Sequence, residues 1–440
     1  MALYTHEIAA QLNDIEVPCA TSKQVLISSM IGNALEWYDF VIYGYFAATF
    51  GSLFFPPSNP VTQILASWVV FWLGFIARPL GSVVFGHIGD KISRKYALTL
   101  SIYLMAIPTA LMGCLPTYAQ IGLAAPILLI IFRAIQGFAI GGEFSGSMVF
   151  LVEHAPSNQR GLWGSWSSFS AVIGVIIGSL LITTLNGTLS ADNMQHWGWR
   201  IPFIVSVLGS VVGGYIRNCL TDPAIYLAAK KKKHKESTPL KELFVSHKSK
   251  MGLIILLDFL TAIGFFIVAI FLATYFRVYL KYPDKIALAI NTFSMCIFAL
   301  AIFFGGKLSD RFGRKKTLGY PCVAFILFSY PLFSLMETAS PMGLLGIQSL
   351  LAFFMGVFFG TIPSALVEIM PTHVRFSGLS IAHNLSMAIF GGSTPLLITY
   401  FIRHYNNLMV PAYFLIAAGM LSLSSLIFMK ERYKLDLQAN

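Results

Sequence analysis

The chain has 440 residues, of which 56% are apolar and only 11% are charged, with a formal net charge of +11. Ordinary soluble domains contain roughly a quarter charged residues. A chain with so few charges could not cover a water-exposed surface with polar groups. The composition therefore excludes a cytosolic enzyme, a disordered chain and a secreted disulfide scaffold, and it indicates a multi-pass membrane protein.

The apolar segments predict an all-α integral membrane protein. A spanning helix needs roughly 20 mostly apolar residues, and the long charge-free intervals of this chain provide them. These intervals are continuously apolar rather than alternating, which favours helices over a β-barrel. We expect twelve transmembrane helices, near residues 24–52, 61–87, 96–115, 119–150, 161–186, 199–217, 251–279, 286–306, 316–336, 342–368, 376–402 and 409–429.

The basic residues predict the orientation of the chain. They gather in the connections that would share one side of the membrane, whereas Lys281, Lys285 and Arg403 are the clearest on the other side. By the positive-inside rule we expect both termini to be cytoplasmic, in a cytoplasmic (inner) membrane. The predicted cytoplasmic segments are 1–23, the basic central loop 218–250 and the short tail 430–440. The run from Lys230 to Lys233 lies in that loop, so we expect a solvated loop and no nucleic-acid partner.

Two loop motifs each occur twice in the chain. The first pair is Gly86, Asp90, Lys91, Arg94 and Lys95 against Gly306, Asp310, Arg311, Arg314 and Lys315, and the second is Glu153, Pro156 and Arg160 against Glu368, Pro371 and Arg375. Two matched elements at nearly the same displacement predict an internal repeat. The repeat consists of two six-helix bundles, 24–217 and 251–429, with the same orientation in the membrane.

The charges of these loops predict a cytoplasmic gate. A loop Asp can cap the helix that follows or pair with an Arg of the other motif. Such pairs would hold the two halves together in one state and break in the other. The alternative is that the basic residues only fix the topology. The expected gate residues are Arg78, Asp90, Arg94, Glu143, Glu153, Arg160, Asp310, Arg314, Glu368 and Arg375.

Further segments extend the pattern of the repeated loops. They are Gly32-Asn33-Ala-Leu-Glu36-Trp37-Tyr38-Asp39-Phe40, Ala77-Arg78-Pro79-Leu80-Gly81, Arg133-Ala-Ile-Gln136-Gly137, Gly141-Gly142-Glu143 and Gly198-Trp199-Arg200-Ile201-Pro202-Phe203. With the loops, they resemble the major facilitator superfamily and, within it, the metabolite:proton symporter family of proline/betaine, 2-oxoglutarate, citrate and shikimate carriers. The resemblance implies two pseudo-symmetric bundles and transport by alternating access. The sequence departs from the family pattern at Ser93, where the loop usually has Gly.

Ionisable residues within the spans predict the site of coupling. Each costs roughly 2.5–3.5 kcal/mol on insertion, so its presence needs a reason. Glu36 and Arg133 lie roughly 18 and 21 Å along their predicted helices, and Asp39 adjoins Glu36. We predict that Glu36, Asp39 and Arg133 form the proton-coupling site, in which a desolvated acid takes a proton and frees Arg133 from an internal partner. A static structural network is the alternative.

The neighbouring polar residues predict the substrate site. Asn33 and Tyr43 share a helix face with Glu36, and Gln136 shares one with Arg133, by three- and four-residue spacing. We expect Asn33, Tyr43, Arg133 and Gln136 to bind the substrate, with the guanidinium of Arg133 holding a carboxylate.

Three functions remain open from the sequence. The first is proton-coupled uptake of a small carboxylate or zwitterion, such as proline/betaine or a di- or tricarboxylate. The second is an exporter working by proton antiport, although span 161–186 lacks the expected Gly-Pro pattern. The third is a nutrient sensor that does not transport. No hydrolase, zinc-protease or phosphate-loop motif is present, so we expect no enzyme.

The sequence predicts no bound cofactor. The coupling ion would be a proton, and the scattered cysteines do not have metal-ligand spacing. We expect a monomer whose partners are its small-molecule substrate and the lipid bilayer.

Overall fold

The computed structural model of this chain is all-helical over the residues that it describes. These are residues 22–91, 94–218, 243, 245–371, 374–435 and 437. The expected segments 1–23 and 218–250 lie largely outside the described residues, and so do the side chains of Asp90 and Arg94.

The first half of the chain supplies the helices of the six expected N-terminal spans. Their bounds are α2 Ser22–Tyr45 with α3 Ala47–Phe54, α4 Pro60–Lys91, α5 Arg94–Cys114, α7 Ala124–Ile140 with α8 Glu143–Glu153, α9 Arg160–Thr188, and α11 Ile201–Asn218; α6 Tyr118–Ile121, α10 Ala191–His196 and η1 Gly198–Arg200 are short connections. The span formed by α7 and α8 is interrupted at Gly141 and Gly142, where the backbone leaves the regular helix.

The second half has the same order of spans, with more irregular helices. Its elements are α14 Lys248–Leu257, α15 Phe259–Phe265, η2 Phe266–Phe271, α16 Leu272–Thr274, η3 Tyr275–Tyr279, α17 Asp284–Phe312, α18 Arg314–Met336, α19 Pro341–Ile369, α20 Arg375–Ser386, η5 Met387–Gly391, α21 Thr394–Tyr405 and α22 Val410–Phe428. The segments η2, η3 and η5 are π-helical. Such wide turns leave backbone carbonyls free to accept other donors, and they are frequent at functional sites.

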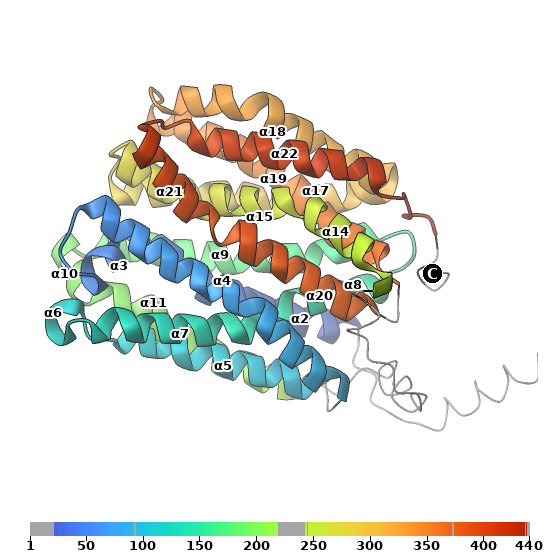
Figure 1. Cartoon of the computed structure of the whole chain (residues 1–440), viewed down its shortest axis with the longest axis horizontal. Coiled ribbons are helices and arrows are strands. Elements are labelled where there is room, and N and C mark those ends of the chain that lie inside the picture. The colour runs from blue at the N-terminus through green and yellow to red at the C-terminus, as the bar shows by residue number, and fades with distance from the viewer. Residues whose placement is uncertain are drawn as a thin grey trace, which may run out of the picture.

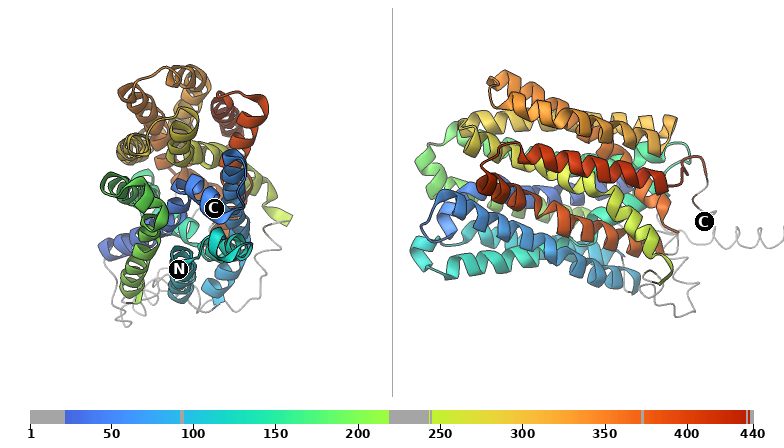
Figure 2. Two further views of the ribbon diagram at one scale, coloured as in Figure 1. Left: turned by 90° about the vertical axis from the view of Figure 1, so that its left-hand side faces the viewer. Right: turned by 45° about the horizontal axis from the view of Figure 1, so that its top comes forward.

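The lengths of the helices agree with the prediction of a membrane-spanning bundle. Over the described residues, nine helices are long and apolar enough to cross a membrane, and two shorter apolar helices lie at Thr99–Cys114 and Gly198–Gly209. In Figure 1 the helices run roughly side by side, with α17, α18, α19 and α22 at the top and α5, α7 and α11 at the bottom. The end-on view of Figure 2 shows that they form a bundle around central helices.

Two interfaces join the halves. Helix α9 packs on α17 and α19, and α4 packs on α20, η5 and α21. The first interface pairs span five with span eight and the second pairs span eleven with span two, as expected if the halves are related by the predicted repeat. One end of the bundle, where α4, α8, α17 and α19 terminate, carries the repeated loops; we call it the loop side, and its other end the opposite side.

Helices α4 and α7 of the first half pack unusually closely at two glycines. A Cβ atom on Gly137 would clash with the carbonyl oxygen of Gly74, so α4 and α7 approach with backbone against backbone. Only small residues allow this approach in a membrane, where van der Waals packing drives helix association. The contact fixes α7 against α4, and it thereby positions Arg133 and Arg78 relative to each other.

Candidate functional site

Arg133 lies fully buried on α7 among aromatic rings. Its guanidinium carbon is 3.8 Å from the ring centroid of Phe40, 4.5 Å from that of Tyr43 and 5.1 Å from that of Phe71. It donates to the carbonyl oxygen of Phe40 at 3.3 Å and to the side chain of Gln136, while its Nε has no hydrogen-bond partner. Among the described residues, no carboxylate forms a salt bridge with it. A buried cation without a counter-ion is costly, so this site favours an incoming anion.

Asp39 is a buried carboxylate surrounded mainly by neutral groups. The hydroxyl of Thr109 donates to its Oδ2 at 3.4 Å. The amide nitrogen of Gln136 donates to the hydroxyl of Thr109 at 2.7 Å and to the carbonyl oxygen of Asp39 at 3.4 Å. Gln136 therefore connects the backbone at Asp39 to the guanidinium of Arg133 through its two amide atoms. Of the expected coupling residues, Asp39 and Arg133 lie in one polar network.

Glu36 belongs to a different pair. Its Oε1 accepts from Nη2 of Arg78 at 3.1 Å, and both side chains are only 2% exposed. The Nε of Arg78 donates to Oδ1 of Asn384 at 3.1 Å, on α20 of the second half. Arg78, which we expected at the cytoplasmic gate, therefore pairs with Glu36 of the expected coupling site and also contacts the second half.

Arg78 lies level with Glu36, and Arg133 lies beyond it, because two helices reach farther toward the loop side than the sequence predicted. Helix α4 continues to Lys91 rather than ending near 87, so Arg78 lies about 20 Å from its loop-side end, level with Glu36. Helix α7 begins at Ala124 and α8 continues to Glu153, so Arg133 lies about 30 Å from the loop side. Arg133 is consequently level with Phe40 and Tyr43, one to two turns beyond Glu36.

The two remaining predicted substrate residues hold helices together in this conformation. Nδ2 of Asn33 donates to the carbonyl oxygen of Ser167 at 2.7 Å and to the hydroxyl of Ser170 at 3.0 Å, which fastens α2 to α9. The hydroxyl of Tyr43 donates to the carbonyl oxygen of Ser67 at 3.2 Å, while its ring faces Arg133. Tyr43 and Gln136 thus contact Arg133, and Asn33 does not.

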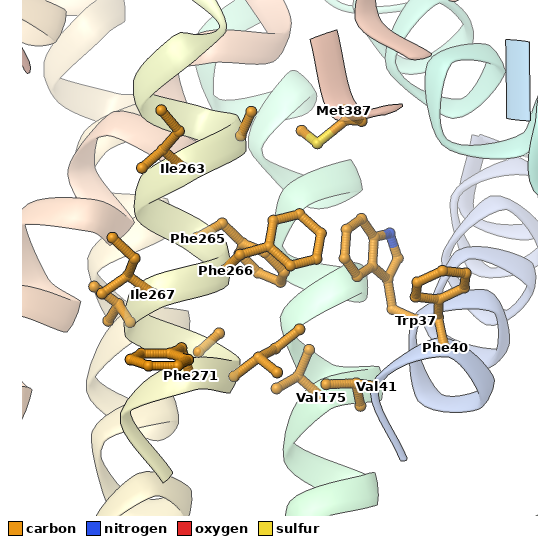
Figure 3. Packing of buried hydrophobic residues seen from close by; sticks show 14 of the residues in the cluster. Trp37, Phe40, Val41, Val175, Ile263, Phe265, Phe266, Ile267, Phe271 and Met387 are labelled. Atoms are coloured by element: carbon orange, nitrogen blue, oxygen red, sulfur yellow. The ribbon is translucent and has the colours of Figure 1, made fainter. Parts of the chain in front are cut away.

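Aromatic rings from both halves meet beside this network. Trp37 of α2 packs edge-on against Phe144 of α8, with ring centroids 5.8 Å apart, and against Phe265 of α15, at 4.8 Å. Phe265 in turn stacks on Phe359 of α19 at 5.2 Å. Figure 3 shows Trp37 facing Phe265 and Phe266 across the contact between the halves, with Met387 nearby. The centre of the molecule is therefore polar on the Arg133 side and aromatic on the side of the second half.

Charged residues of the repeated loops join the halves at the loop side. Nη1 of Arg375 donates to Oε1 of Glu153 at 2.7 Å, and Nη1 of Arg160 is 3.8 Å from Oε1 of Glu368. Each pair connects an element of one half to an element of the other. In both pairs the partner of the Arg is a Glu and not the loop Asp that we expected.

Asp310 and Arg314 complete the loop-side cluster. Asp310 accepts from the backbone N–H groups of Gly161 at 2.8 Å and Leu162 at 2.9 Å, so it caps α9 of the first half. Arg314 donates to Asp310 and to Glu368, both at 2.9 Å. Negative charge at a helix N-terminus is stabilising, because unpaired N–H groups and the helix dipole point toward it.

Glu143 is farther from this cluster. It begins α8 and accepts from the hydroxyl of Ser101 at 3.4 Å. It is buried between the loop-side contacts and the centre.

At the opposite side the halves are joined by hydrogen bonds that the sequence did not predict. Some of them are donated by Arg277 to the carbonyl oxygen of Tyr45 at 3.1 Å and by Arg403 to the hydroxyl of Thr62 at 2.8 Å. The hydroxyl of Tyr45 donates to the carbonyl oxygen of Ala269 at 3.0 Å and accepts from Asn291 at 2.9 Å. Nε1 of Trp72 donates to the carbonyl oxygen of Ala388 at 2.8 Å. Ala269 and Ala388 belong to the π-helical segments η2 and η5. Both ends of the bundle are therefore bridged in this conformation.

The comparisons with known proteins agree with this arrangement. The sequence model of the Major Facilitator Superfamily matches residues 25–395 and 259–437. The proline/betaine transporter of Salmonella typhimurium is 32% identical over 419 residues, which cover 93% of this chain and 83% of that protein. A putative proline/betaine transporter of Staphylococcus haemolyticus is 36% identical over 413 residues, covering 91% and 86%. The structure of the MFS proton:xylose symporter XylE bound to 6-bromo-6-deoxy-D-glucose superposes with a TM-score of 0.75 at 16% identity, covering 93% of this chain and 96% of that one.

Proposed function

Because this chain belongs to the Major Facilitator Superfamily and is a multi-pass membrane transporter rather than an enzyme, we propose that it takes up a small zwitterion of the proline/betaine class together with a proton. The bacterial relatives named as proline/betaine transporters support this substrate class. They also support a location in the inner membrane, and the basic loop side is then the cytoplasmic side.

The observation that carries the proposal is the buried Arg133. It has no carboxylate partner among the described residues, and its Nε is unpaired although it is buried. A substrate carboxylate would supply the missing counter-ion through charge-assisted hydrogen bonds. Gln136 would keep the guanidinium in place, since it already accepts a hydrogen bond from Arg133.

The charges of the centre favour a zwitterion over a di- or tricarboxylate. Two buried arginines, Arg78 and Arg133, face two buried acids, Glu36 and Asp39. A tricarboxylate would bring three negative charges to a site with one cation free of a salt bridge. A zwitterion brings one carboxylate for Arg133 and one ammonium group, which aromatic faces such as those of Trp37 and Phe265 attract.

The same centre offers two acids for the coupling proton. Asp39 has no salt bridge within the described part of the chain, and a lone carboxylate is costly to charge when it is buried. Glu36 is balanced by Arg78, which also binds Asn384 of the second half. A proton on Glu36 would release Arg78 from its counter-ion and weaken its hold on α20. Proton binding is thereby linked to the contact between the halves.

Alternating access would proceed by breaking one set of bridges at a time. Breaking the ionic contact between Glu153 and Arg375 would open the loop side. Breaking the hydrogen bonds of Tyr45 and Trp72 would open the opposite side. All of these groups lie in one chain, which is consistent with transport by a monomer. The lipid bilayer would then be its only large partner.

The test is transport by the purified protein in liposomes. Labelled proline, glycine betaine, citrate and 2-oxoglutarate are offered with and without an imposed pH gradient. We expect the zwitterions to accumulate inside when the outside is more acidic, and the Arg133→Ala variant to lose binding and uptake. Arg200→Gln is the matched control, because Arg200 donates to the carbonyl oxygens of Gly113 and Leu115 away from the centre.

The outcomes separate the alternatives. Accumulation driven by the reverse pH gradient would indicate an antiporter, and binding without flux would indicate a sensor. Uptake by Arg133→Ala at the rate of the unmodified protein would refute the assigned role of Arg133.

A further inference from the structure

A further buried acid, Asp258, lies outside the centre described above, at the junction of α14 and α15. Oδ2 of Asp258 accepts from Nδ1 of His383 on α20 at 2.9 Å, and the two side chains are 0% and 1% exposed. The outer atoms of the pair, Oδ1 of Asp258 and Nε2 of His383, have no hydrogen-bond partner. The hydroxyl of Ser422 on α22 hydrogen-bonds to the backbone at this junction and not to the Asp258 carboxylate.

The neighbouring elements bring no other counter-ion to this pair. Over the described residues, α15, η2, η5 and α22 contain no Lys, Arg or His, and the charged residues on the other packed elements are Arg78, Asp90 and Lys91 on α4, Glu143 and Glu153 on α8, Lys248 and Lys250 on α14, Glu368 on α19 and Arg375 on α20. Arg78, Glu153 and Glu368 have salt-bridge partners of their own. Lys248 and Lys250 begin α14, about 12–15 Å away at helical rise. Within the described part of the chain, His383 is therefore the one group that can balance the charge of Asp258 at hydrogen-bonding distance.

The number of protons on the pair follows from its burial. A carboxylate beside a neutral imidazole would leave one uncompensated negative charge inside the bundle, which is strongly unfavourable. One added proton removes this net charge, whether it rests on His383 as an imidazolium beside the carboxylate or on Asp258 as a carboxylic acid, since the two groups are 2.9 Å apart. The closed conformation thus favours the form that holds the extra proton.

Residues of the first half pack over the Asp258–His383 pair, which lies between the centre and the loop side. The ring of Phe144 on α8 lies 5.4 Å from the ring of His383. Arg375, which bridges to Glu153, precedes His383 by about 12 Å along α20. The residue that follows, Asn384, donates to the carbonyl oxygen of Gly141 and accepts from Arg78. Separation of the halves at the loop side would remove Phe144 and let water reach His383.

We propose that Asp258 and His383 form a second proton-binding site, which holds one proton while the loop side is closed and releases it to water when that side opens. This inference deepens the proposed proton coupling and assigns part of it to the second half of the chain. When the loop side opens, His383 gives up its Nε2 proton to water. Hydration of the exposed Asp258 carboxylate then stabilises the negative charge that remains.

The test begins with the protonation state of His383, which can be measured without any substrate. The protein is labelled with ¹⁵N-histidine in lipid nanodiscs, and the signal of His383 is identified by its loss in the His383→Gln variant. We expect an imidazolium in the unmodified protein and a neutral ring in Asp258→Asn, because the ring has then lost its carboxylate partner. The matched control is the exposed pair of Asp192 and His196, for which Asp192→Asn should leave the His196 signal unchanged. A neutral His383 beside an ionised Asp258, read from the ¹³C signal of its carboxyl group, would overturn the proposal.

The second arm tests release. The double variant Asp258→Asn/His383→Gln keeps two neutral groups that can hydrogen-bond but cannot exchange a proton. Exchange of labelled betaine is measured at equal pH on both sides over a range of pH. We expect the variant to keep exchange but to lose one limb of the pH profile. An unchanged profile would refute release, whereas absence of betaine exchange in the unmodified protein would refute the proposed substrate and leave the histidine measurement valid.

Discussion

The buried pair of Glu36 and Arg78 gives the sharpest prediction about coupling. The two groups are 3.1 Å apart with side chains 2% exposed, so neither charge is screened by water. Removing one member of such a pair costs about 3–5 kcal/mol, because the other charge stays buried and unpaired. In Glu36→Gln this penalty applies to conformations that keep Arg78 dry and bound to Asn384. Since 1.4 kcal/mol is a factor of ten, the variant should favour open conformations by about 150-fold or more.

The expected result is loss of accumulation with exchange retained. A gradient of one pH unit supplies about 1.4 kcal/mol, which lets a one-to-one symporter concentrate its substrate about tenfold. Glu36→Gln should only equilibrate labelled betaine across the liposome membrane. Thermal unfolding of the purified variant should also begin at a lower temperature, because Arg78 has lost its counter-ion.

Two controls keep this prediction falsifiable. The double variant Glu36→Gln/Arg78→Gln removes both charges, so it should recover most of the lost thermal stability without recovering accumulation. Asp284→Asn disrupts the partly exposed pair with Arg277, which should contribute at most about 1 kcal/mol. Normal accumulation by Glu36→Gln would show that Glu36 is not the coupling acid, and additive losses in the double variant would show that the pair is not coupled.

Three other predictions concern the gate, the packing and the topology. Arg375→Gln should open the loop side more often and speed exchange, and the charge-swapped variant Glu153→Arg/Arg375→Glu should restore the original rate. Gly137→Ala should destabilise the protein by about 1–3 kcal/mol in thermal unfolding, since its Cβ would meet backbone, whereas Gly252→Ala, with nothing within 4 Å, should not. Lys434→Cys, made in a variant whose five native cysteines are replaced by Ser, should react with an impermeant thiol reagent only after the cytoplasmic face is opened to it; labelling of intact cells would refute the predicted orientation.

The fold followed from the sequence because its determinants are local or repeated. Charge-free intervals of helix length mark the spans, and the motifs around Asp310 and Glu153 mark the two halves. The profile match and the solved structures confirm the family and the helical fold. For the loop side the sequence predicted which loops carry the charges but not the partners: Asp310 caps α9 rather than the helix that follows it, and Arg375 pairs with Glu153 rather than with an Asp.

The pairing inside the membrane was not predictable in the same way. Depth along a helix depends on where the helix ends, and extending α4 to Lys91 moved Arg78 to the level of Glu36. Which side chains then meet depends on the rotation of each helix, which is set by contacts such as that of Gly137 with Gly74. No pattern within a single helix contains that information.

Neutral residues were missed for a different reason. Tyr45, Trp72 and Asn384 bridge the halves, but a search for charges inside spans passes over them. The only available signal was the presence of a polar amide or a hydrogen-bonding ring within an apolar helix. Asp258 and His383 were not among the predicted site residues, and a search for charges passes over His383 because a histidine does not count in a charge balance at neutral pH.

The chemical difference between the two ends of the bundle bears on how a proton could direct the cycle. Loop-side bridges are ionic, so their strength depends on charge, as between Arg375 and Glu153. The opposite-side bridges described above end on neutral oxygens, as between Tyr45 and Ala269 or Arg277 and Tyr45, so a proton does not change them directly. The side chain of Asn384 lies between these regions, since it binds Arg78 of the central pair and α20 also carries Arg375. A change of charge at Glu36 would therefore act first on the loop side, and the opposite side would respond through the movement of the helices.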